Sequence, residues 1–359
     1  MSTPIRVLIV DDSNYVRLVL KRMLSQARGI EVVGLATDGL EAVHMAARLK
    51  PDVITLDVEM PRLNGLEVLR RVLPRNPIPV VMLSSLTQQG AAVTLEALEL
   101  GAVDFMGKPG SAGVPDLKSV ERQLIARIRG AAKARVLTAT PKRPVLQKMP
   151  ALPRTRSARN PVILIAASTG GPHTLAELLS ALPANLPASL AITQHMPPAF
   201  TEALAARLDR GSSLTVQQAA AGDVLEAGTA LLAPGDYHMI IGPHGIVHLS
   251  QEPPVCGVRP AANPMMISAA TNLRCPLVAL ILTGMGSDGA EGAVAVKQAG
   301  GTVIAQDEHT SVIYGMPRAA ADTGSCDHIA ALYDIPALLV QVVSKLVQMR
   351  QPVLSAQGG

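Results

Sequence analysis

The strongest constraint on the fold of this chain is a repeated alternation of short apolar runs with amphipathic segments. Between residue 5 and about residue 130 the alternation occurs five times, and residues 15–26 place their apolar side chains at helical spacing. Apolar strands that alternate with helices are typical of a parallel sheet covered by helices on both faces. The expected strands are residues 6–10, 31–35, 53–56, 80–83 and 103–106.

A second alternation of the same kind begins near residue 160 and ends in an amphipathic segment at residues 336–349. A chain of 359 residues is long enough for two domains with separate cores. We therefore expect an α/β protein with two doubly wound, mainly parallel-sheet domains. The expected strands of the second domain are residues 162–167, 190–193, 230–233, 277–283 and 301–305.

The positive charge of the chain belongs to one segment. The formal net charge is +4, but residues 126–160 hold ten Lys or Arg and no acidic residue, which leaves 22 basic against 28 acidic residues elsewhere. Four prolines and no periodicity favour a solvated linker over a dedicated phosphate-binding arm. Because interleaved aromatic residues and DNA-reading motifs are missing, we expect no nucleic-acid partner. The predicted domains are residues 1–125 and 160–350, joined by the basic linker 126–159.

Cysteine usage and hydropathy indicate the compartment. The three cysteines are widely spaced and form no C-x-x-C motif, which is typical of reduced thiols. No apolar run is long enough to cross a membrane, and residues 1–4 lead directly into an expected strand rather than a signal sequence. We therefore expect a cytoplasmic protein without membrane insertion.

Acidic residues follow two neighbouring strands of the first expected sheet: Asp11 and Asp12 after the first, and Asp57 after the third. Close carboxylates repel each other by roughly 4 kcal/mol per pair at an effective dielectric near 20, and a hard cation such as Mg²⁺ removes that cost. The alternative is that these residues only cap a helix or end a strand. Ser84 and Lys108 end two further strands, so a hydroxyl and an ammonium group are expected on the same edge.

These residues resemble the response-regulator receiver domain, a flavodoxin-like fold, over about the first 125 residues. The resemblance implies that Asp57 accepts a phosphoryl group, which Ser84 and Lys108 then hold. It also implies that Asp11, Asp12 and Asp57 bind Mg²⁺ together with the Glu59 backbone carbonyl, and that Phe105 is the switch aromatic. The motifs that carry it are Val-Asp-Asp-Ser (10–13), Leu-Asp-Val-Glu-Met-Pro (56–61), Asn-Gly (64–65), Leu-Ser-Ser (83–85) and Lys-Pro (108–109).

Three residues of the second domain follow expected strands in the same way. Ser168 precedes Gly170 and Gly171 at the start of an expected helix, His195 follows the next strand, and Asp288 lies in a glycine-rich loop. A serine hydroxyl becomes nucleophilic when an imidazole takes its proton and a carboxylate orients that imidazole. Taken singly, each residue has a simpler explanation as a cap, a surface residue or a turn. Their shared position at strand ends favours a hydrolase site.

These motifs, and the order of receiver, linker and esterase, resemble the chemotaxis protein-glutamate methylesterases, the CheB family. The resemblance implies Ser168 as nucleophile, His195 as general base and Asp288 as the residue that orients it. It also implies a backbone oxyanion donor at Met285, assistance from Thr169, and no cofactor for ester hydrolysis. Residues 259–263 read Arg-Pro-Ala-Ala-Asn where the family has R-P-S-V-D, which removes a hydroxyl and a carboxylate near the expected substrate rim.

The function that the resemblance implies is hydrolysis of glutamate γ-methyl esters on the cytoplasmic domains of methyl-accepting chemoreceptors, with release of methanol. Deamidation of receptor glutamines is a secondary expectation. A sensor histidine kinase would phosphorylate Asp57, and this phosphorylation would relieve inhibition of the catalytic domain. The alternatives are a non-enzymatic response regulator whose second domain only docks, and a DNA-binding regulator, for which no helix-turn-helix candidate follows the linker.

Overall fold

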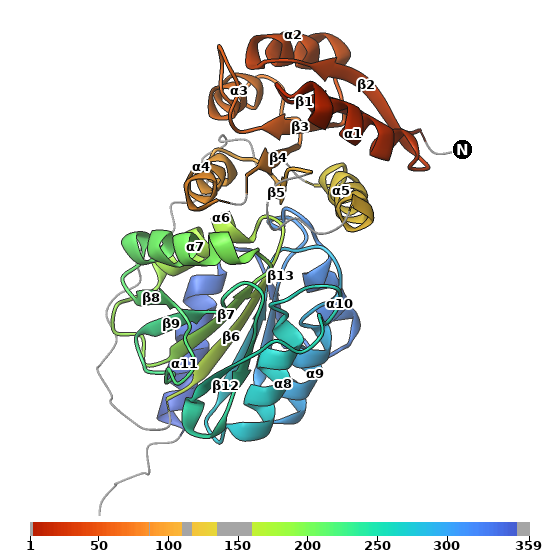
Figure 1. Ribbon diagram of the computed structural model, residues 1–359. Helices are drawn as coiled ribbons and strands as arrows, with labels where there is room; N and C mark the ends of the chain where they lie inside the picture. The colour runs from red at the N-terminus through yellow and green to blue at the C-terminus, as the bar shows by residue number, and fades with distance from the viewer. Residues whose placement is uncertain (1–2, 86, 110–116, 135–159, 350–359) are drawn as a thin grey trace, which may run out of the picture. The chain divides into compact units, whose positions relative to one another are not determined.

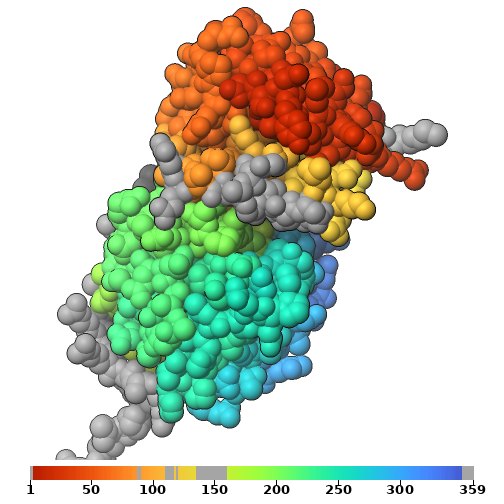
Figure 2. All heavy atoms as spheres, in the orientation of Figure 1, coloured from red at the N-terminus to blue at the C-terminus, as the bar shows by residue number. Residues whose placement is uncertain are grey.

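The computed structural model describes residues 3–85, 87–109, 117–134 and 160–349. The chain forms two compact units, one N-terminal and one C-terminal, which are described separately below. Figure 1 shows their helices and strands, and Figure 2 shows the same units as spheres, coloured by residue number. No helix among these residues is long and apolar enough to cross a membrane.

The N-terminal unit is one five-stranded sheet in the order β2-β1-β3-β4-β5, and all its strand pairs are parallel. Helices α1 and α5 cover one face, and α2, α3 and α4 cover the other (Figure 1). The strand order reverses between β1 and β3, so the predicted flavodoxin-like fold is confirmed. The elements are β1 (Ile5–Val10), α1 (Asn14–Ser25), β2 (Ile30–Ala36), α2 (Gly39–Leu49), β3 (Val53–Asp57), α3 (Gly65–Val72), β4 (Val80–Ser84), α4 (Gln88–Glu99), β5 (Asp104–Gly107) and α5 (Leu117–Ala131).

Local sequence explains how two helices of this unit begin. The Ser13 side chain accepts a hydrogen bond from the backbone of Val16 at the start of α1. At the start of α3, Asn64 and Glu67 form a reciprocal capping box. A Cβ atom at Gly65 would lie 2.3 Å from the carbonyl oxygen of Asp57, so only glycine lets α3 begin this close to the end of β3.

The C-terminal unit contains a seven-stranded sheet in the order β14-β13-β12-β6-β7-β9-β8, again with only parallel pairs. Helices α8, α9 and α10 pack together on one side of it, and α6, α7 and α11 on the other (Figure 1). The strands are β6 (Val162–Ala167), β7 (Ser189–Gln194), β8 (Thr215–Gln218), β9 (Thr229–Leu232), β12 (Leu277–Ile281), β13 (Thr302–Gln306) and β14 (His328–Ala330). The helices are α6 (Gly171–Ala181), α7 (Pro198–Gly211), α8 (Ala262–Asn272), α9 (Ala290–Gln298), α10 (Met316–Asp322) and α11 (Ile335–Gln348).

The core of this unit is built from small and flexible apolar side chains, as the scarcity of aromatic residues requires. All six residues of β6 are buried, and Met265 and Met266 of α8 lie in the same cluster as Ala166 and Ala279. Methionine fills irregular gaps between such small neighbours.

Several elements differ from the expectations. Strands β8 and β14 and the antiparallel hairpin of β10 (His238–Ile241) and β11 (Val247–Ser250) were not predicted; β8 and β14 are partly exposed edge strands, and the hairpin forms a separate two-stranded sheet. Strand β12 ends at Ile281 rather than at 283, and α5 continues past residue 125 to Ala131. Most of the predicted linker, residues 135–159, lies outside the described residues.

Candidate active site

The C-terminal unit brings Ser168, His195 and Asp288 to one edge of its sheet. Ser168 directly follows β6, His195 directly follows β7, and Asp288 lies in the loop between β12 and α9. Strand β6 pairs with β12 on one side and with β7 on the other. The strand order reverses between β6 and β12, which is where open α/β sheets place their ligand sites.

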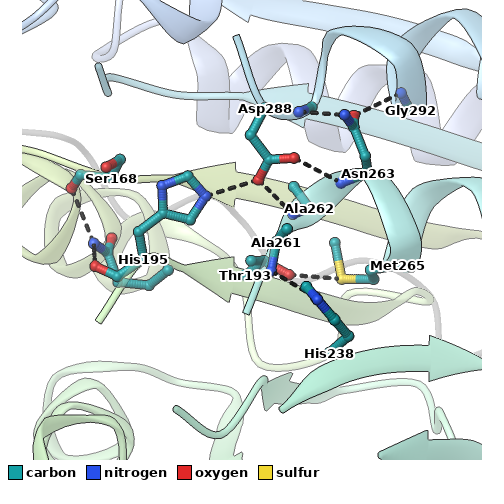
Figure 3. Close-up of polar contacts among 12 residues, drawn as sticks. Ser168, Thr193, His195, His238, Ala261, Ala262, Asn263, Met265, Asp288 and Gly292 are labelled. Carbon is teal, nitrogen blue, oxygen red and sulfur yellow. Dashed lines mark hydrogen bonds and ion pairs between the residues drawn. The ribbon is translucent and has the colours of Figure 1, made fainter. Parts of the chain in front are cut away.

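His195 and Asp288 are joined by a hydrogen bond, with His195 Nε2 2.7 Å from Asp288 Oδ2. Because an ionised carboxylate only accepts, the proton lies on Nε2 and leaves Nδ1 as the acceptor nitrogen of the ring. Figure 3 shows this second nitrogen on the side of the imidazole that faces Ser168. The His195–Asp288 hydrogen bond is thus already formed, whereas among the described residues Ser168 Oγ forms no hydrogen bond to the imidazole ring.

The Asp288 carboxylate is bound by the N-terminus of α8. Its Oδ2 accepts a hydrogen bond from the Ala262 N–H at 2.6 Å, and its Oδ1 accepts one from the Asn263 N–H at 3.0 Å. Burial alone would raise the pKa of Asp288, but the hydrogen bond and charge of His195 and these two amides lower it below its usual range. Asp288 is therefore a stable anion that holds the imidazole in one tautomer.

Asn263 supports the same loop in the reverse direction. Its Oδ1 accepts hydrogen bonds of 2.9 Å from the N–H groups of both Gly289 and Gly292 at the start of α9 (Figure 3). Asp288 thus caps the N-terminus of α8, and Asn263 of α8 caps the N-terminus of α9. Ala261, Ala262 and Asn263 are buried, so the departure from the family's R-P-S-V-D sequence lies beneath Asp288 rather than on an exposed rim.

The loop after β12 lies against the nucleophile. Thr283 accepts a hydrogen bond from the Ser168 N–H at 3.0 Å, and its hydroxyl donates to the Thr169 carbonyl at 3.0 Å. A Cβ atom at Gly284 would lie 2.7 Å from Ser168 Cβ and 2.3 Å from Met316 Sδ, so position 284 has room only for glycine. The Gly284 carbonyl is held by the N–H groups of Gly315 and Met316.

Met285 follows in this loop, and its side chain is partly exposed. Within the described part of the chain its N–H has no hydrogen-bond partner, as an oxyanion donor requires before substrate binds. Thr169, the other predicted assisting residue, is buried directly after the nucleophile, where its carbonyl is bound by Thr283.

Sequence reasoning missed two glutamines at strand ends. Gln194 ends β7, and its amide NH₂ donates to the Ser168 carbonyl. Gln306 ends β13, accepts from the Thr283 N–H at 2.8 Å and donates to the Thr310 carbonyl. The available signal was a buried polar residue that closes an apolar strand, since such a group needs a nearby partner.

The N-terminal unit gathers its acidic residues in the same way, at the ends of β1 and β3. The carboxylates of Asp11, Asp12 and Asp57 offer ligand atoms that all lie within 4.8 Å of one another. Lys108 Nζ lies 2.6 Å from Asp57 Oδ2 and 3.5 Å from Asp11 Oδ2. The predicted cluster of acids and lysine is therefore present, and the Glu59 N–H donates to Asp57 Oδ1.

Asp11 and Asp57 are buried, whereas Asp12 is exposed, and one lysine does not compensate the two buried carboxylates. Burial raises the pKa of Asp57 to about 6, although the hydrogen bond and charge of Lys108 oppose the shift. Burial also raises the pKa of Asp11, whose Oδ2 is buried without a hydrogen-bond partner among the described residues. The pKa of Lys108 is itself raised, because the surrounding carboxylates outweigh its burial. Three clustered carboxylates that share one lysine fit a hard divalent cation with oxygen ligands.

Ser84 ends β4, but its hydroxyl is bonded toward α4. It accepts a hydrogen bond from Thr94 Oγ1 at 2.7 Å and donates to the Ser85 carbonyl at 3.1 Å. The hydrogen of the Ser84 hydroxyl is therefore directed at the Ser85 carbonyl in this structure. Phe105, the predicted switch aromatic, is buried.

Comparison with known proteins agrees with this two-site organisation. A family model described as CheB methylesterase matches residues 163–339, and one described as response regulator receiver domain matches residues 7–114. A protein-glutamate methylesterase/protein-glutamine glutaminase of Pyrococcus abyssi is 45% identical over 353 residues, which cover 95% of this chain and 94% of that protein. The corresponding protein of Thermotoga maritima is 43% identical and covers 94% of this chain and 98% of its own. The chain belongs to the CheB methylesterase family.

Membership of the CheB methylesterase family confirms the predicted resemblance and the predicted two-domain α/β architecture. It places the chain among the hydrolases, and it disfavours both the docking-module and the DNA-binding alternatives. The receiver match ends at residue 114 and the CheB methylesterase match begins at 163, so neither includes the basic segment 126–159.

Proposed function

We propose that this CheB-family methylesterase uses Ser168 as nucleophile, His195 as general base and Asp288 as the residue that orients the base. Its substrates are glutamate γ-methyl esters on the cytoplasmic domains of methyl-accepting chemoreceptors, so we expect it in the cytoplasm. The observation that carries the proposal is the 2.7 Å bond between His195 and Asp288, with the other ring nitrogen facing Ser168. Receptor methyl esters fit because the relatives' names specify protein glutamate as their substrate.

The proposed reaction has two halves. Nδ1 of His195 takes the proton of Ser168 Oγ as the oxygen attacks the ester carbonyl, and the same proton then passes to the departing methoxide, which leaves as methanol. Water, deprotonated by His195, hydrolyses the acyl-enzyme to free glutamate and Ser168. Asp288 stabilises the imidazolium formed in each half. The Met285 N–H is suited to bind the oxyanion, with Thr169 assisting beside the serine, and hydrolysis itself is expected to need no cofactor.

The same residues can deamidate receptor glutamines. The attack by Ser168 is identical, but the C–N bond breaks, and the protonated His195 must give its proton to the amide nitrogen so that this nitrogen departs as ammonia. Amide hydrolysis is harder than ester hydrolysis, so we expect deamidation as the slower activity. The relatives carry both activities in their names.

The receiver domain supplies the proposed control. A sensor histidine kinase provides the phosphoryl group for Asp57, and Lys108 and Ser84 hold it once the Ser84 hydroxyl turns from the Ser85 carbonyl to the phosphoryl oxygens. Asp11, Asp12, Asp57 and the Glu59 carbonyl would hold Mg²⁺, which neutralises charge on the phosphoryl oxygens when bound. We propose that phosphorylation relieves inhibition of the catalytic domain.

Methanol release from methylated receptor membranes tests the proposal. Ser168→Ala should lose activity to background, whereas Ser213→Ala, at an exposed serine, should match the wild type. A small-molecule phosphodonor should raise the activity of the wild-type chain and leave Asp57→Asn unchanged. Full activity in Ser168→Ala would contradict the catalytic assignment, and equal stimulation of Asp57→Asn would contradict the control.

A further inference from the structure

One amide group joins the backbones of the predicted nucleophile and the predicted base. Gln194 is almost fully buried at the end of β7, directly before His195. Its Nε2 donates to the Ser168 carbonyl at 2.9 Å and to the His195 carbonyl at 3.2 Å. The two hydrogens of one NH₂ group therefore bind both catalytic residues.

The start of α6 is shaped to accept this side chain. Gly171 also donates to the Ser168 carbonyl, at 2.7 Å, so that oxygen receives two hydrogen bonds and the peptide plane after the nucleophile is fixed. A Cβ atom at position 171 would lie 2.0 Å from Gln194 Oε1. Any residue larger than glycine at 171 would therefore push the Gln194 amide away from Ser168.

The environment of the Gln194 amide oxygen explains which way the amide group is oriented. Gln194 Oε1 is buried and has no hydrogen-bond partner among the described residues, which is costly for a polar atom. The reversed orientation would place this oxygen against two carbonyl oxygens. The observed orientation therefore leaves Oε1 unpaired while it keeps both donor contacts.

No side-chain hydrogen bond joins Ser168 and His195 in the structure. The distance between the Ser168 hydroxyl and the imidazole therefore depends on how their backbones are held. Three features link the regions of the two residues: the pairing of β6 with β7, the His195 N–H, which donates to the Ala167 carbonyl at 3.1 Å, and the Gln194 amide. A displacement of about 1 Å at a reacting centre can lower a rate about 100-fold.

We propose that Gln194 is a positioning residue that sets the distance from Ser168 Oγ to the His195 ring, and that Gly171 provides the space it needs. The inference rests on the proposed function. Gln194 touches no substrate atom in this scheme, so its loss should lower kcat and leave KM nearly unchanged.

The first test replaces Gln194 in the full-length chain with a residue of similar size that cannot donate. Gln194→Met should lower kcat about 10- to 100-fold on a synthetic receptor peptide carrying a glutamate γ-methyl ester, with KM within about twofold. The modification of Ser168 by a fluorophosphonate should slow by a similar factor, because that reaction needs the nucleophile and base but no receptor contacts. Gln218→Met is the matched control, since Gln218 also ends a strand, β8, and its side-chain oxygen accepts a hydrogen bond from Thr201 Oγ1.

The second test moves the amide without removing it. Gly171→Ala should lower kcat to a similar degree in an otherwise wild-type chain. In a chain that already carries Gln194→Ala, the same change should have little further effect, because the displaced group is absent. Such non-additivity separates a shared role from two independent structural defects.

The outcomes are distinct. Wild-type kcat in folded Gln194→Met, a loss confined to KM, or additive effects of the 171 and 194 substitutions would each overturn the positioning role. If Gln194→Met does not fold, the Gly171→Ala cycle decides alone. A Ser168→Ala chain run in parallel separates the two levels: if it hydrolyses the peptide, the proposed function fails, and if it is inactive while Gln194→Met is normal, only this inference fails.

Discussion

Asp57 and Asp288 are both carboxylates at the carboxyl edge of a parallel sheet, and each has a relative exposure of only 1%. Their acidities nevertheless shift in opposite directions. The pKa of Asp57 is raised to about 6, chiefly by burial, whereas the pKa of Asp288 is lowered although burial acts on it in the same sense. The difference between the two sites therefore comes from the partners of each carboxylate and not from its depth.

The number of donors for each negative charge explains the contrast. Asp288 receives the imidazole N–H and two backbone amides at a helix N-terminus. Asp57 receives Lys108 and one backbone amide, and it shares that lysine with Asp11. A carboxylate with enough donors is a permanent anion suited to orient a base. One with too few favours a proton, a metal ion or a chemical modification.

The largest expected effect comes from removing the charge of Asp288. Asp288→Asn should lower kcat for methanol release by about 10³- to 10⁴-fold, because an amide NH₂ facing Nε2 forces the wrong tautomer of His195. Asp322→Asn, which changes an exposed carboxylate paired with Arg318, should leave kcat unchanged. Activity of Asp288→Asn within tenfold of wild type would show that the donors around Asp288 serve only the fold.

A second prediction asks whether the catalytic edge also needs its close packing. Gly284→Ala should lower kcat by about 100-fold and stability by about 1–3 kcal/mol, because its Cβ would meet Ser168 Cβ at 2.7 Å. Gly211→Ala is the matched control, since nothing lies within 4 Å of its Cβ position. Thermal unfolding and methanol release measure the two effects. Normal activity in Gly284→Ala would mean that the loop can move away from the nucleophile without cost.

The sequence could predict where the site residues lie along the strands, but not which residues are their hydrogen-bond partners. Apolar runs located the strands, and strand ends located Ser168, His195, Asp288, Asp57 and Lys108, because the parallel topology brings those ends together. The partners were harder to predict. Asn263 lies 25 residues from Asp288 in sequence, and Gln194 lies 26 from Ser168. Such contacts depend on tertiary packing and leave no periodic signal.

Hydroxyl direction was also beyond the sequence. Ser84 was correctly placed at the end of β4, but only the structure shows it bonded to Thr94. The edge strands β8 and β14 and the hairpin of β10 and β11 were missed, although the equally short strands β5 and β9 were predicted, so length alone does not explain the difference. Position along a strand is thus readable, whereas side-chain rotamers and short edge elements are set by their neighbours.

A third prediction uses pH to separate the two carboxylates. Because the folded pKa of Asp57 is raised from 3.8 to about 6, its contribution to stability is complete below pH about 4 and is lost as pH rises through about 6. The lowered pKa of Asp288 acts oppositely: its contribution is present above pH about 4 and is lost as pH falls through its folded pKa.

Calorimetric unfolding of the whole chain, without divalent ions, can measure both signs. Between pH 4 and 7, Asp57→Asn should gain roughly 1–3 kcal/mol relative to wild type. Asp288→Asn should be less stable than wild type at pH 7, and this deficit should shrink as the solution is made more acidic. Parallel pH profiles for both variants and the wild type would remove the contrast between the sites.

The smallest expected effect is stabilisation by Mg²⁺, which should bind at the Asp57 site and not at the Asp288 site. At ten times its Kd, Mg²⁺ should stabilise the chain by about 1.4 kcal/mol and raise one calorimetric transition by a few degrees. Asp12→Asn should abolish that shift, because it removes one of three clustered carboxylates, while Asp52→Asn and Asp288→Asn should preserve it. An equal shift in Asp12→Asn would place the bound ion elsewhere. The acidic cluster around Asp57 would then not be a cation site, and the raised pKa of Asp57 would reflect mainly its burial.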